Sequence, residues 1–240
     1  NDARLAGQVD WNAIVDRTRS LVEWQHEEGV PEALERMRKN YMLDMWRNQP
    51  VRVEVWVEKE ALAGVFHRIC GKYDVPYFAC RGYTSASSSY GAYQRVVERV
   101  PDQKTLILHF GDHDPSGIDM TRDIEDRLSL MTNRGNGDSD FDDCFEVRRL
   151  ALNHDQVLRY NPPPSPAKIT DSRAEGYIAK FGEDSWELDA LDPTQLANLA
   201  EREISRVIDD DLWDETEEKI RNDRALIRRF INEAEKSQKH

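Results

Sequence analysis

Through the middle of the chain, segments with the apolar pattern of strands alternate with segments that have the pattern of helices. This alternation is the strongest constraint on the fold. The strands are predicted at 51–57, 75–80, 104–110 and 145–152, and the helices at 60–72, 88–100 and 117–131. Strands separated by helices pair in parallel through right-handed crossovers. The sequence therefore predicts an α/β fold built on a parallel sheet.

The sequence on either side of this alternation is predicted to be mainly helical. Apolar residues between positions 11 and 22 share one helical face, and the proline-rich run at 162–166 marks a boundary after the alternating region. Asp192 and Pro193 then have the N-cap and first-turn chemistry that opens a helix. We expect a helical extension over 1–49, a central domain over 50–160, and a mostly helical extension over 161–240.

Two aspartates follow the predicted strand at 104–110 almost directly. The apolar run stops before Asp112 and Asp114, and Pro115 to Gly117 turn the chain into the next helix. In open α/β sheets, ligands bind in the crevice beyond the carboxyl ends of the strands. Carboxylates at this position are hard oxygen ligands of the kind that suits Mg²⁺. Asp112 and Asp114 are therefore candidate metal ligands.

A third acid, Glu58, ends the predicted strand at 51–57. If this strand and the strand at 104–110 are neighbours, Glu58 faces the same crevice as Asp112 and Asp114. Three carboxylates would then surround one metal-sized space. Glu60, two residues further on, is interpreted as a favourable charge in the first turn of a helix, with a second acid at the site as the alternative.

These motifs resemble those of a Toprim domain. The resemblance rests on Val57 to Ala61, on the pair Arg81 and Gly82, and on Asp112 to Gly117, and it covers roughly residues 50 to 152. The motifs are most similar to the Toprim domain in the A subunit of topoisomerase VI and its meiotic double-strand-break relatives. The resemblance implies about four parallel strands flanked by helices, with Mg²⁺, or Mn²⁺ in its place, between the glutamate and the two aspartates.

The resemblance also implies a function, a magnesium-dependent nuclease that hydrolyses phosphodiester bonds. Asp112 and Asp114 would hold the metal, Glu58 would share it or act as general acid or base, and Arg81 would steady a phosphate. The implied partner is nucleic acid, DNA in preference to RNA. Because the tyrosine nearest to the N-terminus, Tyr41, lies in an ordinary helical segment, we expect hydrolysis without a covalent tyrosyl intermediate.

Three other functions stay open. The chain could be a DNA-breaking subunit, similar to the A subunit of topoisomerase VI, that needs a partner. It could also be a non-catalytic metal-binding module for nucleic acid or protein. The string from Asp112 to Ser116 also fits, loosely, the nucleophile motif of haloacid-dehalogenase-type phosphatases. In those enzymes the motif follows the first strand, whereas here two strand units precede it.

Three further residues are weaker candidates for the site. His113 lies between the two aspartates, and strand alternation predicts that its side chain points away from theirs. A hydrogen-bonding or phosphate-binding role is the hypothesis for it. Glu187 and Asp189 would add metal ligands if their segment folds back over the crevice, and would otherwise belong to a polar strand face.

The net charge of −13 argues against a strong grip on duplex DNA, which usually requires a basic face. We therefore expect modest affinity for nucleic acid. Candidates for a local basic face are Arg81, Arg148, Arg149, Arg159, Lys168, Arg173 and Lys180. A charged helix expected at about 211–236 indicates a homo-oligomer or a protein partner.

Cysteine usage and hydropathy bear on the cellular compartment of the protein and on membrane association. The three cysteines are widely separated and offer neither a disulfide framework nor a zinc-binding spacing, so a reducing cytoplasm is expected. No apolar run approaches the roughly 18 residues that a membrane span requires, so we expect no membrane partner.

Overall fold

The computed structural model describes residues 6, 24, 26–80, 82–98, 103–136, 144–167 and 170–237. The chain forms two compact units, Asn1–Tyr41 with Asn222–His240, and Met42–Arg221. Some predictions lie outside the described residues. They concern the apolar helical face at 11–22, Arg81 and Lys168.

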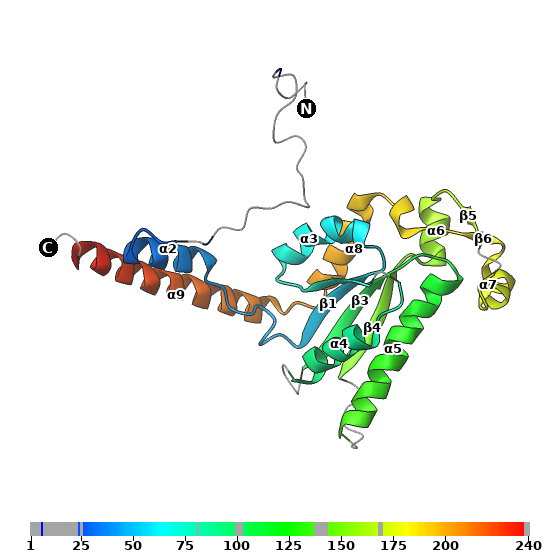
Figure 1. The fold of residues 1–240 in the computed structure, drawn as a ribbon, viewed down its shortest axis with the longest axis horizontal. Coiled ribbons are helices and arrows are strands. Elements are labelled where there is room, and N and C mark those ends of the chain that lie inside the picture. Colours follow the sequence, from blue (N-terminus) through cyan, green and yellow to red (C-terminus); the bar gives the residue numbers. More distant parts are fainter. Residues whose placement is uncertain are drawn as a thin grey trace. The chain divides into compact units, whose positions relative to one another are not determined.

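The centre of the larger unit is a four-stranded parallel sheet with the strand order β2-β1-β3-β4 (Figure 1). Its strands are β1 (Val51–Val57), β2 (Tyr77–Ala79), β3 (Lys104–Phe110) and β4 (Phe145–Ala151). β1 and β3 pair along their whole length, from Val51 opposite Lys104 to Val57 opposite Phe110. The predicted α/β fold with a parallel sheet is therefore confirmed.

Helices cover both faces of this sheet (Figure 1). Contacts join α4 to α5 and α3 to α8, and they join α3 to β1 and α5 to β4. The helices are α3 (Ala63–Lys72), α4 (Ala86–Glu98), α5 (Pro115–Asn136), α6 (His154–Tyr160) and α8 (Pro193–Ser205). A short 3-10 turn, η2 (Glu60–Leu62), precedes α3.

Strand alternation sends successive side chains into the two helical layers. Trp56 of β1 and Ile107 of β3 belong to a buried cluster with Ile124 and Leu128 of α5. On the other face, the ring centroid of Phe110 lies 4.6 Å from that of Phe66 in α3. Because both faces of β1 and β3 are buried, the two strands form the centre of the core.

The segment after α6 contains short elements before the long helices begin. These are β5 (Ser165–Pro166), α7 (Ala174–Phe181), β6 (Asp184–Ser185) and the 3-10 turn η4 (Leu188–Ala190). β5 and β6 pair in antiparallel. α8 then starts as its sequence predicts, because Asp192 accepts a hydrogen bond from the backbone N–H of Thr194 at 2.7 Å.

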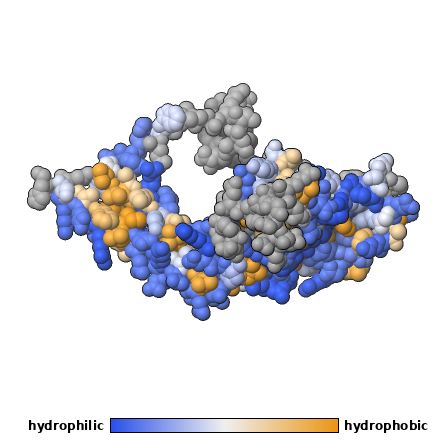
Figure 2. All heavy atoms as spheres, turned by 90° about the horizontal axis from the view of Figure 1, so that it is seen from below, coloured by the Kyte–Doolittle hydropathy of each residue, from blue (hydrophilic) through white to orange (hydrophobic). Residues whose placement is uncertain are grey.

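The smaller unit contains α2 (Val30–Asn40) and the C-terminal part of α9 (Asp210–Ser237). The Tyr41 hydroxyl donates to Asp223 Oδ2 at 2.7 Å, and Arg228 Nη1 lies 3.3 Å from Glu35 Oε2. Apolar side chains are visible on the surface of this helical pair (Figure 2). Within the described ranges of the chain, no helix has the length and apolar character that crossing a membrane requires.

A buried histidine lies on β3 in the core. His109 is fully buried, and its Nδ1 lies 2.8 Å from Thr121 Oγ1 of α5. Within the described part of the chain, its Nε2 has no hydrogen-bond partner. Burial, together with the nearby charge of Arg149, lowers the pKa of His109 to about 3. The folded protein therefore holds this imidazole neutral.

We predict that His109 makes the protein sensitive to acid. As the pH falls below about 6.5, the unfolded chain takes up a proton on this residue and the folded chain does not. Stability that is complete above about pH 6.5 is then lost, at up to roughly 1.4 kcal/mol per pH unit, as the pH falls towards the folded pKa. In urea unfolding between pH 6 and 4.5, His109→Asn should show a shallower pH dependence than the wild type by about that amount.

The matched control is His67→Asn, at an exposed position of α3. This control should keep the pH dependence of the wild type. An unchanged slope in His109→Asn would contradict the assignment.

Candidate active site

Glu58 and Asp112 meet at the carboxyl ends of β1 and β3. Because Val57 lies opposite Phe110, the two strands end side by side. The backbone N–H of Glu58 donates to the carbonyl of Phe110 at 2.8 Å, and the backbone N–H of Asp112 donates to Glu58 Oε2 at 2.8 Å. Strand pairing therefore joins two candidate residues that lie 54 positions apart in the sequence.

Asp114 lies two residues beyond Asp112 and directly precedes α5. Its Oδ1 accepts hydrogen bonds from the backbone N–H of Gly117 at 2.6 Å and from the Ser116 hydroxyl at 3.0 Å. At Gly117 the chain passes so close that a Cβ there would lie 2.3 Å from the carbonyl oxygen of Asp112. Glycine is therefore needed at this position to bring the two aspartates together.

The three carboxylates repel one another in a partly buried place. Burial, followed by the negative charge of Asp112, raises the pKa of Glu58 to about 7, and Asp114 adds to the effect. Burial also raises the pKa of Asp112, with Asp114 contributing and Lys59 opposing. Such a cluster is costly without a cation, because each charge disfavours the ionised form of the others.

Lys59 supplies positive charge at the edge of this cluster. Its Nζ lies 3.4 Å from Asp112 Oδ1, and 2.9 Å from both Glu187 Oε2 and Asp189 Oδ1. Burial disfavours the charged amine, but the hydrogen bonds to Asp189 and Glu187 outweigh that effect and raise the pKa of Lys59. The side chain therefore stays charged and ties the segment around η4 to the strand ends.

The segment containing Glu187 and Asp189 folds back to the site, which was one of the two alternatives for it. The backbone N–H of Leu188 donates to Asp112 Oδ1 at 2.7 Å. The side chains of Glu187 and Asp189 contact Lys59, whereas the backbone of this segment contacts Asp112. The structure shows the fold-back alternative and not the polar strand face, whereas a ligand role for Glu187 and Asp189 stays a prediction.

Arg149 of β4 lies behind the site, and the interpretation of it as part of a basic face is corrected. Its guanidinium donates to the carbonyls of Gly111 at 3.0 Å, Gly117 at 2.8 Å and Leu152 at 3.2 Å, and also to that of Asp112. Burial lowers the pKa of Arg149 to about 10. These hydrogen bonds tie together the segments that carry the acids.

His113 points away from the two aspartates, as strand alternation predicts. Its Nδ1 lies 2.8 Å from the Tyr177 hydroxyl, and its backbone pairs with Trp186. The ring centroid of Phe181 lies 4.8 Å from that of His113. Burial lowers the pKa of His113 to about 4, so it is neutral at pH 7. It acts as a packing residue that attaches α7 to the site.

The carboxylates fit a hard cation by their chemistry. Within the described residues, no group of three His, Cys, Asp or Glu side chains already has an arrangement that would hold a metal ion. One oxygen of each acid accepts a backbone N–H, whereas no described residue donates to the second oxygen of Glu58, Asp112 or Asp114. Mg²⁺ usually keeps several waters and needs only one or two protein carboxylates. The residues therefore suit it.

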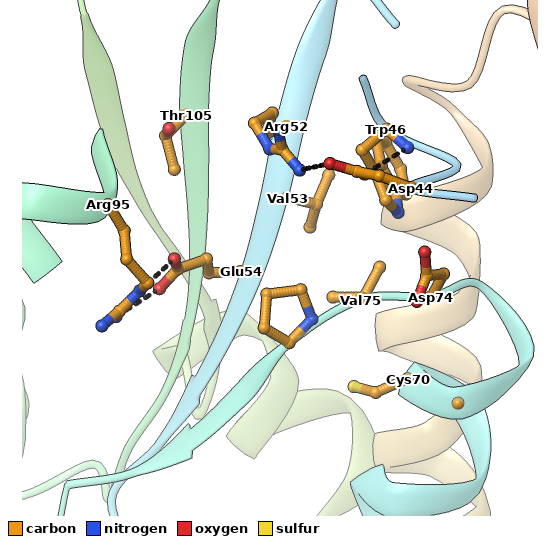
Figure 3. A pocket seen from close by; sticks show the side chains of 12 residues that line it. Asp44, Trp46, Arg52, Val53, Glu54, Cys70, Asp74, Val75, Arg95 and Thr105 are labelled. Carbon is orange, nitrogen blue, oxygen red and sulfur yellow. Dashed lines mark hydrogen bonds and ion pairs between the residues drawn. The ribbon is translucent and has the colours of Figure 1, made fainter. Parts of the chain in front are cut away.

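Two candidates are left. Glu60 is exposed and begins η2, and Arg81 lies outside the described residues. A cavity of about 390 Å³ is found at the opposite, amino ends of β1 and β3 (Figure 3). Four of its five lining charges form two ion pairs, Arg95 with Glu54 at 2.7 Å and Arg52 with Asp44 at 2.5 Å, and Asp74 accepts a hydrogen bond from the backbone N–H of Met45. This cavity has no part in the acidic cluster.

Sequence reasoning missed two parts of the site. Lys59 lies between two acids in the sequence, and its position at the strand end could have identified it as an ion-pair partner of the site carboxylates. Leu188 contributes only a backbone N–H, for which no side-chain signal exists. Both contacts depend on how far η4 folds back, which the local sequence does not determine.

No family model and no curated protein matches this chain. Among solved structures, a de novo designed Rossmann fold protein aligns with 46% of this chain and 93% of its own length. Its sequence identity to this chain is 15%, and the TM-score is 0.28. A likeness this weak carries no conclusion, and the Toprim resemblance stays a prediction from the motifs.

We predict that Gly117→Ala lowers the free energy of unfolding. The added methyl group would collide with the Asp112 carbonyl, a backbone atom that Arg149 also holds, and such overpacking costs about 1–3 kcal/mol. Gly64→Ala in α3 is the control, because a Cβ there has no neighbour within 4 Å. That change should stabilise the helix by roughly 0.5–1 kcal/mol. Urea unfolding of both variants measures the difference, and equal effects would contradict the assigned close approach.

Proposed function

We propose that this protein is a metal-dependent enzyme that hydrolyses phosphodiester bonds of nucleic acid, DNA in preference to RNA. The observation that carries the proposal is the contact between Glu58 and Asp112 at the paired ends of β1 and β3, with Asp114 next to them. In open α/β sheets, ligands bind beyond the carboxyl ends of the strands, where these residues lie. The Toprim resemblance of the same three residues supplies the reaction class.

Each residue has a distinct role in this proposal. Asp112, Asp114 and Glu58 supply the carboxylate oxygens that would hold Mg²⁺, or Mn²⁺ in its place. When bound, the metal ion supplies a Lewis acid for the phosphate oxygen and stabilises the leaving oxygen. In the metal-free protein the pKa of Glu58 is about 7, so a Glu58 that does not hold the metal itself can take a proton from water, or return one, near neutral pH. Arg81 would steady a phosphate.

A second candidate is a non-catalytic binding module, and one observation favours it. The ammonium group of Lys59 lies 3.4 Å from Asp112 Oδ1, so the chain partly neutralises its own cluster. The two candidates differ in catalysis. Calorimetric titration with Mg²⁺ and Mn²⁺ should give saturable binding for both, so cleavage of plasmid DNA with either ion would favour the enzyme, and metal binding without cleavage would favour the module.

We predict that Asp112→Asn and Asp114→Asn each abolish metal-dependent cleavage while the protein stays folded. An amide keeps the oxygen that accepts a backbone N–H, but it removes a charge that a cation requires. Loss of the mutual repulsion should leave the metal-free protein as stable as the wild type or slightly more stable. Glu58→Gln should also lose activity, yet retain more metal binding if its main role is proton transfer.

The matched control is Asp126→Asn, on the exposed side of α5, where the carboxylate pairs with Arg122. This variant should cleave plasmid and oligonucleotide substrates at the wild-type rate. Calorimetry and cleavage rates are measured for all four variants. Full activity in Asp112→Asn, or an equal loss in Asp126→Asn, would remove the basis of the site.

We further predict that cleavage leaves no protein bound to DNA. Tyr41 belongs to the smaller unit, and its hydrogen bond to Asp223, followed by burial, raises its pKa, which makes it a poor nucleophile. After denaturation, no covalently attached DNA should be recovered, and Tyr41→Phe should cleave normally. Recovery of attached DNA from the wild type, lost in Tyr41→Phe, would show a tyrosyl intermediate instead.

A further inference from the structure

A pocket of about 280 Å³ lies between α5 and α7. Pro115 and Ile118, in the first turns of α5, form one part of its lining, and Tyr177 and Phe181 of α7 form another. Pro115 directly follows Asp114, and the Tyr177 hydroxyl donates to the carbonyl of His113 at 2.9 Å. The pocket is therefore built on the same loop as the candidate carboxylates.

Basic side chains gather in this pocket, although the chain is acidic overall. Arg122, Arg173 and Lys180 line it, and among the described lining residues Asp119 is the one acid. Asp119 pairs with Arg122 at 2.8 Å and with Arg173 at 2.7 Å, and each arginine also contacts one aspartate outside the lining. Lys180 makes no ion pair with a described carboxylate. Lys180 therefore supplies a positive charge that no described carboxylate pairs with, on a chain whose net charge is −13.

Aromatic rings lie among these cations. The ammonium of Lys180 lies 5.6 Å from the ring centroid of Phe181, which is only partly buried. The guanidinium of Arg173 lies 5.2 Å from the ring centroid of Tyr83, and the Tyr83 hydroxyl donates to Asp119 at 2.8 Å. Proteins that bind single strands combine cations for the backbone with aromatic faces on which bases stack.

We infer that this pocket receives one unpaired base and its adjoining phosphate from a single-stranded segment of nucleic acid. The inference rests on the proposed function and names its substrate class. Lys180 and Arg173 contact the phosphate, and the base stacks on Phe181. A base within a duplex is already stacked and paired, so a single strand or a frayed end fits the pocket and an intact duplex does not.

The test is binding of a fluorescent single-stranded oligonucleotide, measured by anisotropy in EDTA over a range of salt concentrations. Phe181→Ala should weaken binding by about 10-fold and leave the salt dependence unchanged, because stacking is lost and charge is kept. Lys180→Gln should lower the slope of log affinity against log salt by about 0.7, the value for one phosphate contact on a single strand.

Matched controls come from α9. Phe230→Ala removes an exposed phenylalanine and Lys236→Gln removes an exposed lysine, and both variants should bind like the wild type. Equal losses in the controls, wild-type binding by both pocket variants, or equally tight binding of a blunt duplex would overturn the inference. Phe181 packs against His113, so its variant is checked by thermal unfolding. Lys180 is exposed, and its variant carries the test if Phe181→Ala does not fold.

Cleavage assays separate this inference from the proposed function. If the pocket variants lose binding as expected but the wild type cleaves nothing with Mg²⁺ or Mn²⁺, the inferred binding of a single strand by the pocket is supported and the nuclease proposal is contradicted. If Asp112→Asn abolishes cleavage but Phe181→Ala and Lys180→Gln bind and cleave like the wild type, the proposed nuclease function is supported and the inferred role of the pocket is contradicted. If both hold, Phe181→Ala should raise KM more than it lowers kcat.

Discussion

The parallel pairing of β1 with β3 is the constraint on which the rest of the structure depends. All seven residues of β1 face a partner in β3, and the two strands end at Val57 and Phe110. Because the register fixes where each strand ends, it also fixes where Glu58 and Asp112 begin. A shift of one residue would send the core side chains to the opposite faces and separate the two acids.

The acids are held in place by backbone and by buried charge. Each carboxylate accepts a backbone N–H, and Arg149 binds four carbonyls of the loops below them. The guanidinium therefore does two things, since it fixes the loops and places a positive charge beneath three negative ones. Lys59 adds a second positive charge from the solvent side. Burial and the charges of Asp112 and Asp114 outweigh the effect of Arg149 and raise the pKa of Glu58 to about 7.

The sequence predicts much of this arrangement but not all of it. β1 and β3 are found at the predicted residues, because their apolar patterns are long and end in charges. Glu58, Asp112 and Asp114 could be identified because residues at strand ends share one edge of a parallel sheet. The inward turn of Arg149 and the contact from Leu188 could not, since both depend on packing between distant segments. Arg81 lies outside the described residues.

The contact between Leu188 and Asp112 spans 76 positions of the chain, and it has a consequence for folding. Long-range contacts form slowly, because the intervening chain must lose conformational entropy before the favourable free energy of the contact offsets that loss. A chain still being synthesised already contains its acids before η4 exists to complete their surroundings. The complete site is therefore a late product of folding, and the nascent chain holds its carboxylates without the segment around η4 that contacts Lys59.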